Sequence, residues 1–280
     1  MIWIRTAPFK LKLAPQALYG MLALATATLG ACDGGGRDDW RPKVAPASTQ
    51  ADAAEAGYVA PPHIRQALKG AAGLVLVGQS APNANVRLGA PTGEALVARA
   101  DAVGGWRLTV PPSDRVRLFG LSMTQPGRTV QAEGYVMITP DGIVALLRAG
   151  SGAWRLASGS ASPNILAVDI DPDGGAVVSG MAAPGAGLGV RVDRTPRAVG
   201  EAADDGRFFL SLSETLGPGG HDIQVSGEGG EQRIRINVLP PAPLANGPVR
   251  AQREAGGWRI DWLTPGGGVQ TTLITSAATE

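Results

Sequence analysis

The chain contains one cysteine, Cys32, among its 280 residues. A cysteine thiolate is a strong nucleophile, so this side chain is well suited to accept an alkyl or acyl group. No second cysteine is present to form a disulfide with it. The residues directly before it are Leu29, Gly30 and Ala31, and they close an apolar stretch without charges that begins at residue 13. These features make Cys32 a candidate for covalent modification at the end of a targeting segment.

Residues 1–31 have the plan of an export signal. Three basic residues lie before residue 13, and the apolar stretch that follows is shorter than a typical transmembrane helix. The sequence Leu29-Gly30-Ala31-Cys32 resembles the lipobox of bacterial lipoproteins. This resemblance implies that Cys32 is lipidated, that residues 1–31 are removed, and that acyl chains then anchor the protein. An ordinary signal peptide with an incidental cysteine is the alternative.

A second candidate for chemistry is the run Asp169-Ile170-Asp171-Pro172-Asp173-Gly174. Alternate carboxylates followed by glycine have the form of a calcium-binding loop. The twelfth position is Gly180, however, where an EF-hand needs a bidentate glutamate. The plain interpretation is a polar junction between two domains that ends in a tight turn. We therefore predict no metal site and no cofactor, and leave calcium as an alternative.

Catalytic chemistry is not indicated elsewhere. The two histidines, His63 and His221, lie in unrelated contexts, and no nucleophile elbow, P-loop or zinc-protease motif is present. We therefore predict a protein that is not an enzyme, with no catalytic residues. A Trp-Arg pair occurs three times, at residues 106–107, 154–155 and 258–259. Neighbours in a strand point to opposite faces, so we expect buried tryptophans and solvated arginines. The alternative is a glycan platform that includes Trp154, Trp258 or Trp262.

The charge balance excludes a nucleic-acid binder driven by net charge, because 25 basic residues face 24 acidic ones. After loss of residues 1–31, 22 basic and 24 acidic residues remain, so the acyl chains must supply the anchoring. Residues 32–72 are rich in Gly, Ala, Asp and Pro and predict a flexible tether. A short helix over residues 62–68 is possible within it, since Pro62 and Gly70 flank that segment.

An internal repeat spans most of the remaining chain. Residues 78–88 align with residues 180–190 at an offset of 102, and the same offset places Trp106 on Phe208. Farther along, residues 152–156 align with residues 256–260 at an offset of 104. This period is too long for a solenoid. It predicts two tandem domains, residues 73–172 and 173–280.

Within each unit, apolar and polar residues alternate in short runs separated by turn residues, which predicts an all-β fold. The second unit contains four short segments in order: Val178-Ser179-Gly180, Pro184-Gly185-Ala186, Asp204-Asp205-Gly206 and Gly217-Pro218-Gly219-Gly220-His221. In this order they resemble bacterial Ig-like repeats and the carboxypeptidase regulatory-like module. The first unit has Asn83 and Val103-Gly104-Gly105 at the corresponding turns. Both families are β-sandwiches, so the resemblance implies two tandem Ig-like domains and says little about function.

Together these features predict a cell-envelope lipoprotein that faces the periplasm from the inner or the outer membrane. Its expected role is that of a non-enzymatic structural or partner-binding module. The expected partners are the membrane, through the lipid on Cys32, and an unknown envelope protein or glycan, with no nucleic acid. The alternative function is binding of carbohydrate or peptidoglycan through exposed aromatic side chains.

Overall fold

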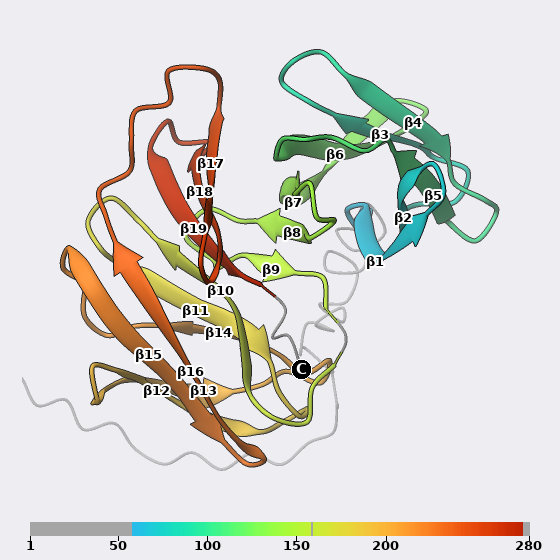
Figure 1. Ribbon diagram of the computed structural model, residues 1–280. Coiled ribbons are helices and arrows are strands. Elements are labelled where there is room, and N and C mark those ends of the chain that lie inside the picture. Colours follow the sequence, from blue (N-terminus) through green and yellow to red (C-terminus); the bar gives the residue numbers. More distant parts are fainter. Residues whose placement is uncertain (1–57, 158, 277–280) are drawn as a thin grey trace, which may run out of the picture. The chain divides into compact units, whose positions relative to one another are not determined.

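The computed structural model describes residues 58–157 and 159–276 (Figure 1). All the secondary-structure elements assigned in this part of the chain are β-strands, and neighbouring strands pair antiparallel throughout. The predicted all-β class with Ig-like sandwiches is confirmed. The signal segment, Cys32 and the tether up to residue 57 lie outside the described residues.

The first sandwich consists of two sheets. Sheet 1 has three strands, in the order β1 (His63–Gly70), β2 (Gly73–Gln79) and β5 (Gly105–Val110). Sheet 2 has six strands, in the order β4 (Ala95–Arg99), β3 (Asn85–Gly89), β6 (Arg117–Gln125), β7 (Arg128–Ile138), β8 (Val144–Leu147) and β9 (Trp154–Arg155).

The second sandwich is built in the same way. Sheet 3 has six strands, in the order β14 (Arg207–Ser211), β11 (Ala176–Met181), β10 (Asn164–Ile170), β19 (Val269–Thr275), β18 (Gly257–Leu263) and β17 (Val249–Glu254). Sheet 4 has four strands, in the order β13 (Thr195–Glu201), β12 (Gly187–Val192), β15 (Gly219–Gly227) and β16 (Gly230–Val238).

The strand orders reveal the duplication directly. The order β1-β2-β5 in the first sandwich corresponds to β10-β11-β14 in the second, and β4-β3-β6-β7 corresponds to β13-β12-β15-β16. Each seven-strand unit is therefore a sandwich of three strands on four. The repeat at an offset of 102, which the sequence predicts, has the same topology in both copies.

Two aligned glycines, Gly78 and Gly180, hold the same structural position in the two copies. A Cβ atom at either one would overlap the carbonyl oxygen of a residue in the first strand of its unit. It would also overlap the aromatic ring on the next strand of the sheet, which is Trp106 in one copy and Phe208 in the other. Glycine is thus required here by close packing, because ring atoms of the neighbouring strand and a backbone carbonyl oxygen already occupy the place of a Cβ atom.

The predicted tether and helix differ from the structure at their C-terminal end. Residues 63–70 form strand β1, which pairs along its length with β2, so the expected helix over residues 62–68 is wrong. Ile64 is buried in the core of the first sandwich, at 5% exposure. Proline before a segment and glycine after it delimit a strand as well as a helix, and pairing with β2 decides between the two.

The last part of the predicted repeat also differs. Strand β10 pairs with β11 and β19, so it belongs to the second sandwich although it precedes the predicted boundary after residue 172. The segments aligned at an offset of 104 have different partners: β9 pairs with β8 in sheet 2, whereas β17, β18 and β19 extend sheet 3 beside β10. Similar local sequences therefore occupy unlike places, because sheet partners are chosen by tertiary packing.

Three apolar cores separate the four sheets. One core lies between sheets 1 and 2 and includes Trp106 and Phe119. A second lies between sheets 3 and 4 and includes Phe208 and Ile223. The third joins residues of sheet 2 to residues of sheet 3, and Trp262 is its largest fully buried side chain. Sheets 2 and 3 are thus covered on both faces, and the two sandwiches form one compact unit within residues 54–280.

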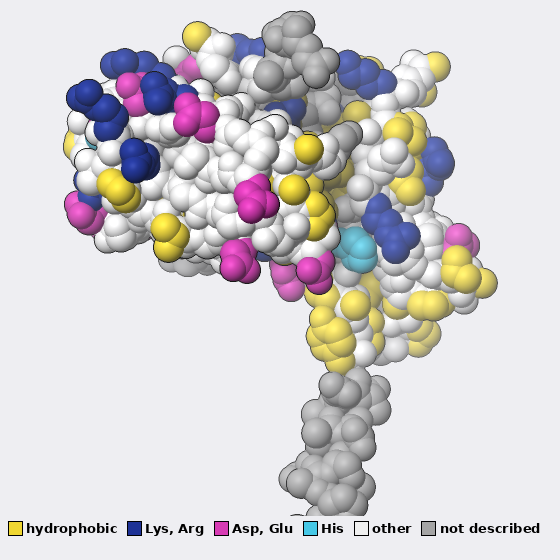
Figure 2. Space-filling view, turned by 90° about the horizontal axis from the view of Figure 1, so that it is seen from below, with side chains coloured by type: hydrophobic (Ala, Val, Ile, Leu, Met, Phe, Trp, Pro, Cys, Tyr) yellow, Lys and Arg dark blue, Asp and Glu magenta, His cyan; other side chains and the backbone are white. Residues whose placement is uncertain are grey.

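The face shown in Figure 2 carries both signs of charge. Basic side chains, either Lys or Arg, lie among aspartate and glutamate side chains on this face, and many of its hydrophobic side chains gather at the lower right of the view. This distribution agrees with the near balance of basic and acidic residues in the sequence.

Candidate functional site

The junction between sheets 2 and 3 holds three of the residues singled out in the sequence, Asp169, Trp258 and Trp262. We call the apolar cluster between these sheets the junction core: Leu118, Met137, Ala145, Leu147, Ala153, Ala167, Ile260, Trp262 and Ile274. Trp262 is fully buried there, and its ring meets that of Tyr135 edge to face, with centroids 6.0 Å apart. Its Nε1 atom donates a hydrogen bond of 3.0 Å to Thr272 Oγ1.

A buried carboxylate lies beside the junction core. Asp169, on β10, is 3% exposed. Its Oδ1 atom accepts hydrogen bonds from Thr272 Oγ1 at 2.6 Å and from Gln270 Nε2 at 2.9 Å, and its Oδ2 atom accepts one from the backbone N–H of Ala153. Gln270 in turn accepts a bond from the N–H of Gly150, at 3.1 Å. Asp169 therefore ties sheet 3 to the loop between β8 and β9 in the first sandwich.

Burial raises the pKa of Asp169, because a low-dielectric surrounding disfavours the charged form. The bonds from Thr272, Ala153 and Gln270 oppose that effect, as does the positive charge of Arg148. All three bonds are donated to the carboxylate, so Asp169 acts as an acceptor that organises its neighbours. The sequence predicted that Asp169 lies in a polar junction between two domains. The structure places its side chain in the interior, where it accepts bonds from both sandwiches.

The calcium alternative is not supported by the geometry. Asp169 points into the junction, whereas Asp171 Oδ1 accepts bonds from the N–H groups of Asp173 and Gly175, at 2.9 and 2.8 Å, and so closes the turn. No group of three or more His, Cys, Asp or Glu side chains within the described residues could hold a metal ion. The alternating aspartates thus serve one buried network and one tight turn.

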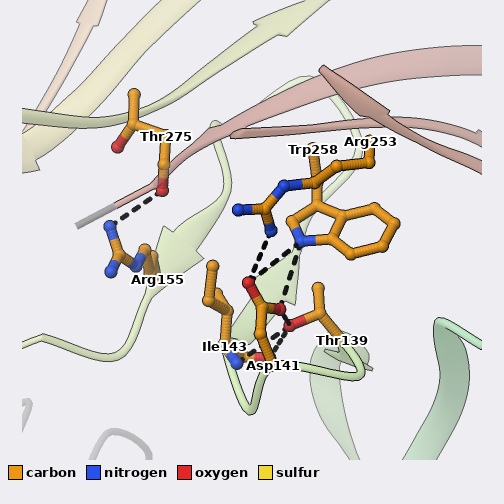
Figure 3. A network of polar contacts seen from close by, with 7 residues as sticks. All are labelled: Thr139, Asp141, Ile143, Arg155, Arg253, Trp258 and Thr275. Carbon is orange, nitrogen blue, oxygen red and sulfur yellow. Dashed lines mark hydrogen bonds and ion pairs between the residues drawn. The ribbon is translucent and has the colours of Figure 1, made fainter. Parts of the chain in front are cut away.

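A polar clamp lies at the edge of the same junction (Figure 3). Asp141 sits in the turn between β7 and β8, and its Oδ2 atom accepts a bond of 2.6 Å from Arg253 Nη1. Its Oδ1 atom accepts bonds from Trp258 Nε1 at 3.1 Å and from Thr139 Oγ1 at 2.5 Å. Because Arg253 and Trp258 belong to β17 and β18, Asp141 connects the first sandwich to the strands added to sheet 3.

The pKa of Asp141 is lowered. Burial by itself would raise it, but the bonds from Thr139, Arg253, Trp258 and the Asp141 backbone outweigh burial. The folded-state pKa therefore lies below that of the unfolded chain. The clamp contributes stability above the unfolded pKa of about 3.9, and this contribution is lost as the pH falls through the folded pKa.

Replacing Asp141 by asparagine is expected to lower the free energy of unfolding by about 1 kcal/mol at pH 7. Its side chain and that of Arg253 are 42% and 51% exposed, so solvent screens the ion pair and keeps the effect small. The difference from the wild type should shrink as the pH is lowered below about 4. Urea unfolding at several pH values measures it, with Asp173→Asn in an exposed turn as the control. An equal effect of both variants at pH 7 would contradict the clamp.

The three Trp-Arg pairs have three different arrangements. In β5, Trp106 is buried and Arg107 is exposed, as predicted. In β18 the prediction is wrong, because Arg259 is 5% exposed while Trp258 is only half-buried. In β9, Trp154 and Arg155 are both half-buried. Since both faces of sheet 3 are covered, alternation along β18 does not separate an inside from an outside.

The buried Arg259 forms an ion pair and hydrogen bonds that were not predicted from the sequence. Its Nη2 atom lies 3.1 Å from Asp261 Oδ1 and donates to Leu239 O at 2.9 Å and to Thr271 Oγ1 at 3.2 Å. Thr271 Oγ1 donates to the same Asp261 oxygen, at 2.7 Å. The Arg-x-Asp spacing on one strand face was the available signal, because residues two apart share a face.

The aromatic residues do not form one platform for a glycan. Trp262 is buried, so it is not available to a ligand. Trp154 and Trp258 are half-buried and line different pockets. An arginine lies over each ring: Arg207 at 3.7 Å from the centroid of Trp154 and Arg253 at 5.3 Å from that of Trp258. These contacts stabilise the rings where they stand.

The two histidines lie far apart in the fold. His63 begins β1 at an exposed position, and His221 lies in β15. His221 Nδ1 is 2.8 Å from Asp193 Oδ2, and its Nε2 is 2.8 Å from Gly217 O. Asp193 stands in the turn between β12 and β13 with a φ of 50°, and its Oδ1 accepts the N–H of Asp222 at 2.9 Å. His221 thus fastens a strained turn to β15.

Replacing His221 by asparagine should cost less than about 1 kcal/mol, and most of the cost should appear at low pH. Burial lowers the pKa of His221, but the bonds to Asp193 and Gly217 outweigh burial and raise it overall. The contribution is therefore fully present below the unfolded pKa of about 6.5 and is lost as the pH rises through the folded pKa. Thermal unfolding at pH 5.5 and pH 8.5 measures this. Asp193→Asn should remove the same pH dependence, and a cost that grows with pH would contradict the pairing.

Several predicted features lie outside the described residues: Cys32 and the lipobox residues Leu29, Gly30 and Ala31. Lipidation at Cys32 therefore remains a prediction. Residues 58–157 and 159–276 contain no helix with the length and apolar character that a membrane span needs.

No protein-family model matches the chain, and no curated relative matches it. Among solved structures, a chain described as "Biofilm associated protein - BSP domain" is similar over 68% of this chain, with 16% sequence identity and a TM-score of 0.23. The match covers 30% of that chain, so this chain spans less than one third of its length.

Proposed function

We propose that this chain is a lipid-anchored protein of the bacterial cell envelope whose two sandwiches serve as a non-enzymatic structural or partner-binding module. The lipid on Cys32 holds it to the inner or the outer membrane, with the sandwiches in the periplasm. Residues between Cys32 and β1 act as the tether. The lipobox resemblance of residues 29–32 supports the anchor.

The junction core is the observation that supports a single rigid module made of both sandwiches. Trp262 and its apolar neighbours from both sandwiches are buried together, and Asp169 ties the two units by hydrogen bonds. Burial of this kind between domains opposes relative motion. A module whose two sandwiches keep a stable mutual orientation suits a scaffold, which must present its partner-binding faces in a defined arrangement relative to each other.

Metabolic labelling with an alkyne fatty acid tests the anchor. The wild type should be labelled and should fractionate with membranes, whereas Cys32→Ser should be unlabelled. Label on neither protein, with the wild type free in the periplasm, would overturn the anchor.

Crosslinking in intact cells tests the scaffold role. An envelope protein captured by the wild type, and lost when the anchor is removed by Cys32→Ser, would support partner binding at the membrane. Co-sedimentation of the chain with purified peptidoglycan tests the glycan alternative. Sedimentation that Trp154→Ala and Trp258→Ala both abolish would favour that alternative over a protein partner.

A further inference from the structure

A pocket of about 280 Å³ opens where the first sandwich meets β14 of the second. Its apolar wall comes from the first sandwich: Leu121, Val136, Val144, Leu146 and Leu156. Pro61 and Pro62, just before β1, form another side. The lining also includes two arginines, Arg148 after β8 and Arg207 at the start of β14. His63, Glu133 and Trp154 are its other polar or aromatic side chains. Pockets at such junctions, with an apolar wall and a few convergent polar groups, are the usual form of small-molecule sites.

Aromatic rings hold both arginines in place. The guanidinium carbon of Arg148 lies 4.4 Å from the ring centroid of Phe209, and that of Arg207 lies 3.7 Å from the centroid of Trp154. Arg207 and Phe209 are two residues apart on β14, so they share one face of the strand. A guanidinium fixed by stacking loses little further freedom when it binds an anion.

Each arginine uses only part of its donor set on the protein. Arg148 donates from Nε to Gly152 O at 3.0 Å and from Nη2 to Ser151 O at 3.3 Å, and Arg207 Nε pairs with Asp205 at 2.9 Å. For Arg148 Nη1 and for both Nη atoms of Arg207, no acceptor is found among residues 58–157 and 159–276. Donors therefore remain for a ligand.

The two cations also act on each other. Burial lowers the pKa of Arg148, and the nearby charge of Arg207 lowers it as well, while Glu133 and Asp169 act in the opposite direction. Glu133, on the pocket wall, is exposed. An anion placed between the two guanidinium groups would relieve their repulsion and accept from their remaining donors.

We propose that this pocket binds a small organic anion, whose carboxylate or phosphate lies between Arg148 and Arg207 and whose apolar body packs on the leucine and valine wall. The apolar wall favours a ligand with several carbon atoms. The two arginines favour an anionic group that accepts several hydrogen bonds, such as a carboxylate or a phosphate. The proposal does not depend on the lipid anchor, because the two arginines and the leucine and valine wall all belong to the sandwiches.

Calorimetric titration with octanoate tests the proposal on the full chain carrying Cys32→Ser, so that no acyl chain is attached. Octanoate should bind at least tenfold more tightly than 1-octanol, which has a similar apolar body without the charge. Inorganic phosphate, which has the charge without the body, should also bind at least tenfold more weakly. Equal binding of octanoate and octanol, equal binding of octanoate and phosphate, or no heat with octanoate up to millimolar concentration would each overturn the proposal.

Variants assign the binding to the pocket. Arg148→Gln and Arg207→Gln should each weaken octanoate binding about tenfold or more, because each removes a charged donor. Arg107→Gln, which removes an exposed arginine on β5, is the matched control and should leave binding unchanged. If Arg148→Gln impairs folding, as circular dichroism would show, Arg207→Gln decides alone. Unchanged affinity in Arg207→Gln would place the octanoate elsewhere and overturn the proposal.

Discussion

Replacing Trp262 by alanine is expected to lower the free energy of unfolding by about 3–5 kcal/mol. The side chain is fully buried in the junction core, so its removal leaves a cavity lined by residues of both sandwiches. The edge-to-face contact with Tyr135 is lost, and Thr272 loses the bond from the indole N–H. Equilibrium unfolding in urea, followed by tryptophan fluorescence and circular dichroism, measures the change.

Tyr58→Ala is the matched control, because Tyr58 is an aromatic residue that is 69% exposed. Its replacement should change stability by less than about 0.5 kcal/mol. A cost below about 1 kcal/mol for Trp262→Ala would mean that the junction core contributes little. The proposed rigid module would then lose its main support, whereas the lipid anchor and the anion pocket would not be affected.

Replacing Gly180 by alanine should destabilise the second sandwich by about 3 kcal/mol or more, at the upper end of the range for overpacking. An added Cβ atom would overlap the carbonyl oxygen of Asn164 and would stand 2.7 Å from the Cζ atom of Phe208. The carbonyl belongs to the paired strand β10 and cannot rotate away. Alanine would therefore disrupt either the pairing of β10 with β11 or the packing of Phe208. The midpoint of urea unfolding measures the loss.

Gly187→Ala provides the control within the same sandwich. Gly187 begins β12, and a Cβ atom there would meet no atom within 4 Å. Alanine should be neutral or slightly stabilising at this position, since it reduces the freedom of the unfolded chain. Equal effects of the two substitutions would show that close approach of the Phe208 ring does not restrict position 180. Gly78→Ala, in the first sandwich, should reproduce the effect of Gly180→Ala.

The lipid anchor depends on sequence alone. Cys32 and residues 29–31 lie outside the described residues, so their interpretation comes from residue types and spacing. The anion pocket depends on structure alone, because Arg148, Arg207 and Trp154 are brought together by the docking of two units and share no sequence motif. These two proposals can therefore fail independently.

Local chemistry made the strands and turns predictable. Predicted turn residues adopt the backbone conformations that their types favour: Asn83 has a φ of 56°, and Gly104 and Gly206 have φ values of 85° and 78°. Only glycine enters this region at no steric cost, and asparagine tolerates it better than most residues. Alternation in β5 likewise identified Trp106 as buried and Arg107 as exposed. The duplication at an offset of 102 then predicted two sandwiches, because equal turns and equal alternation produce equal folds.

Tertiary structure alone decided which faces are buried at the junction. In β10, β18 and β19 both faces are covered, so alternation no longer separates inside from outside, and Arg259, Asp169 and Trp262 are all interior. It also decided the partners of β1 and of β17 to β19, since a strand's own residues do not specify the sheet that it joins. Short-range sterics and the alternation of apolar and polar residues were enough to predict the β-fold and the repeat. The junction, the buried polar network and the pocket required long-range packing, which no local pattern encodes.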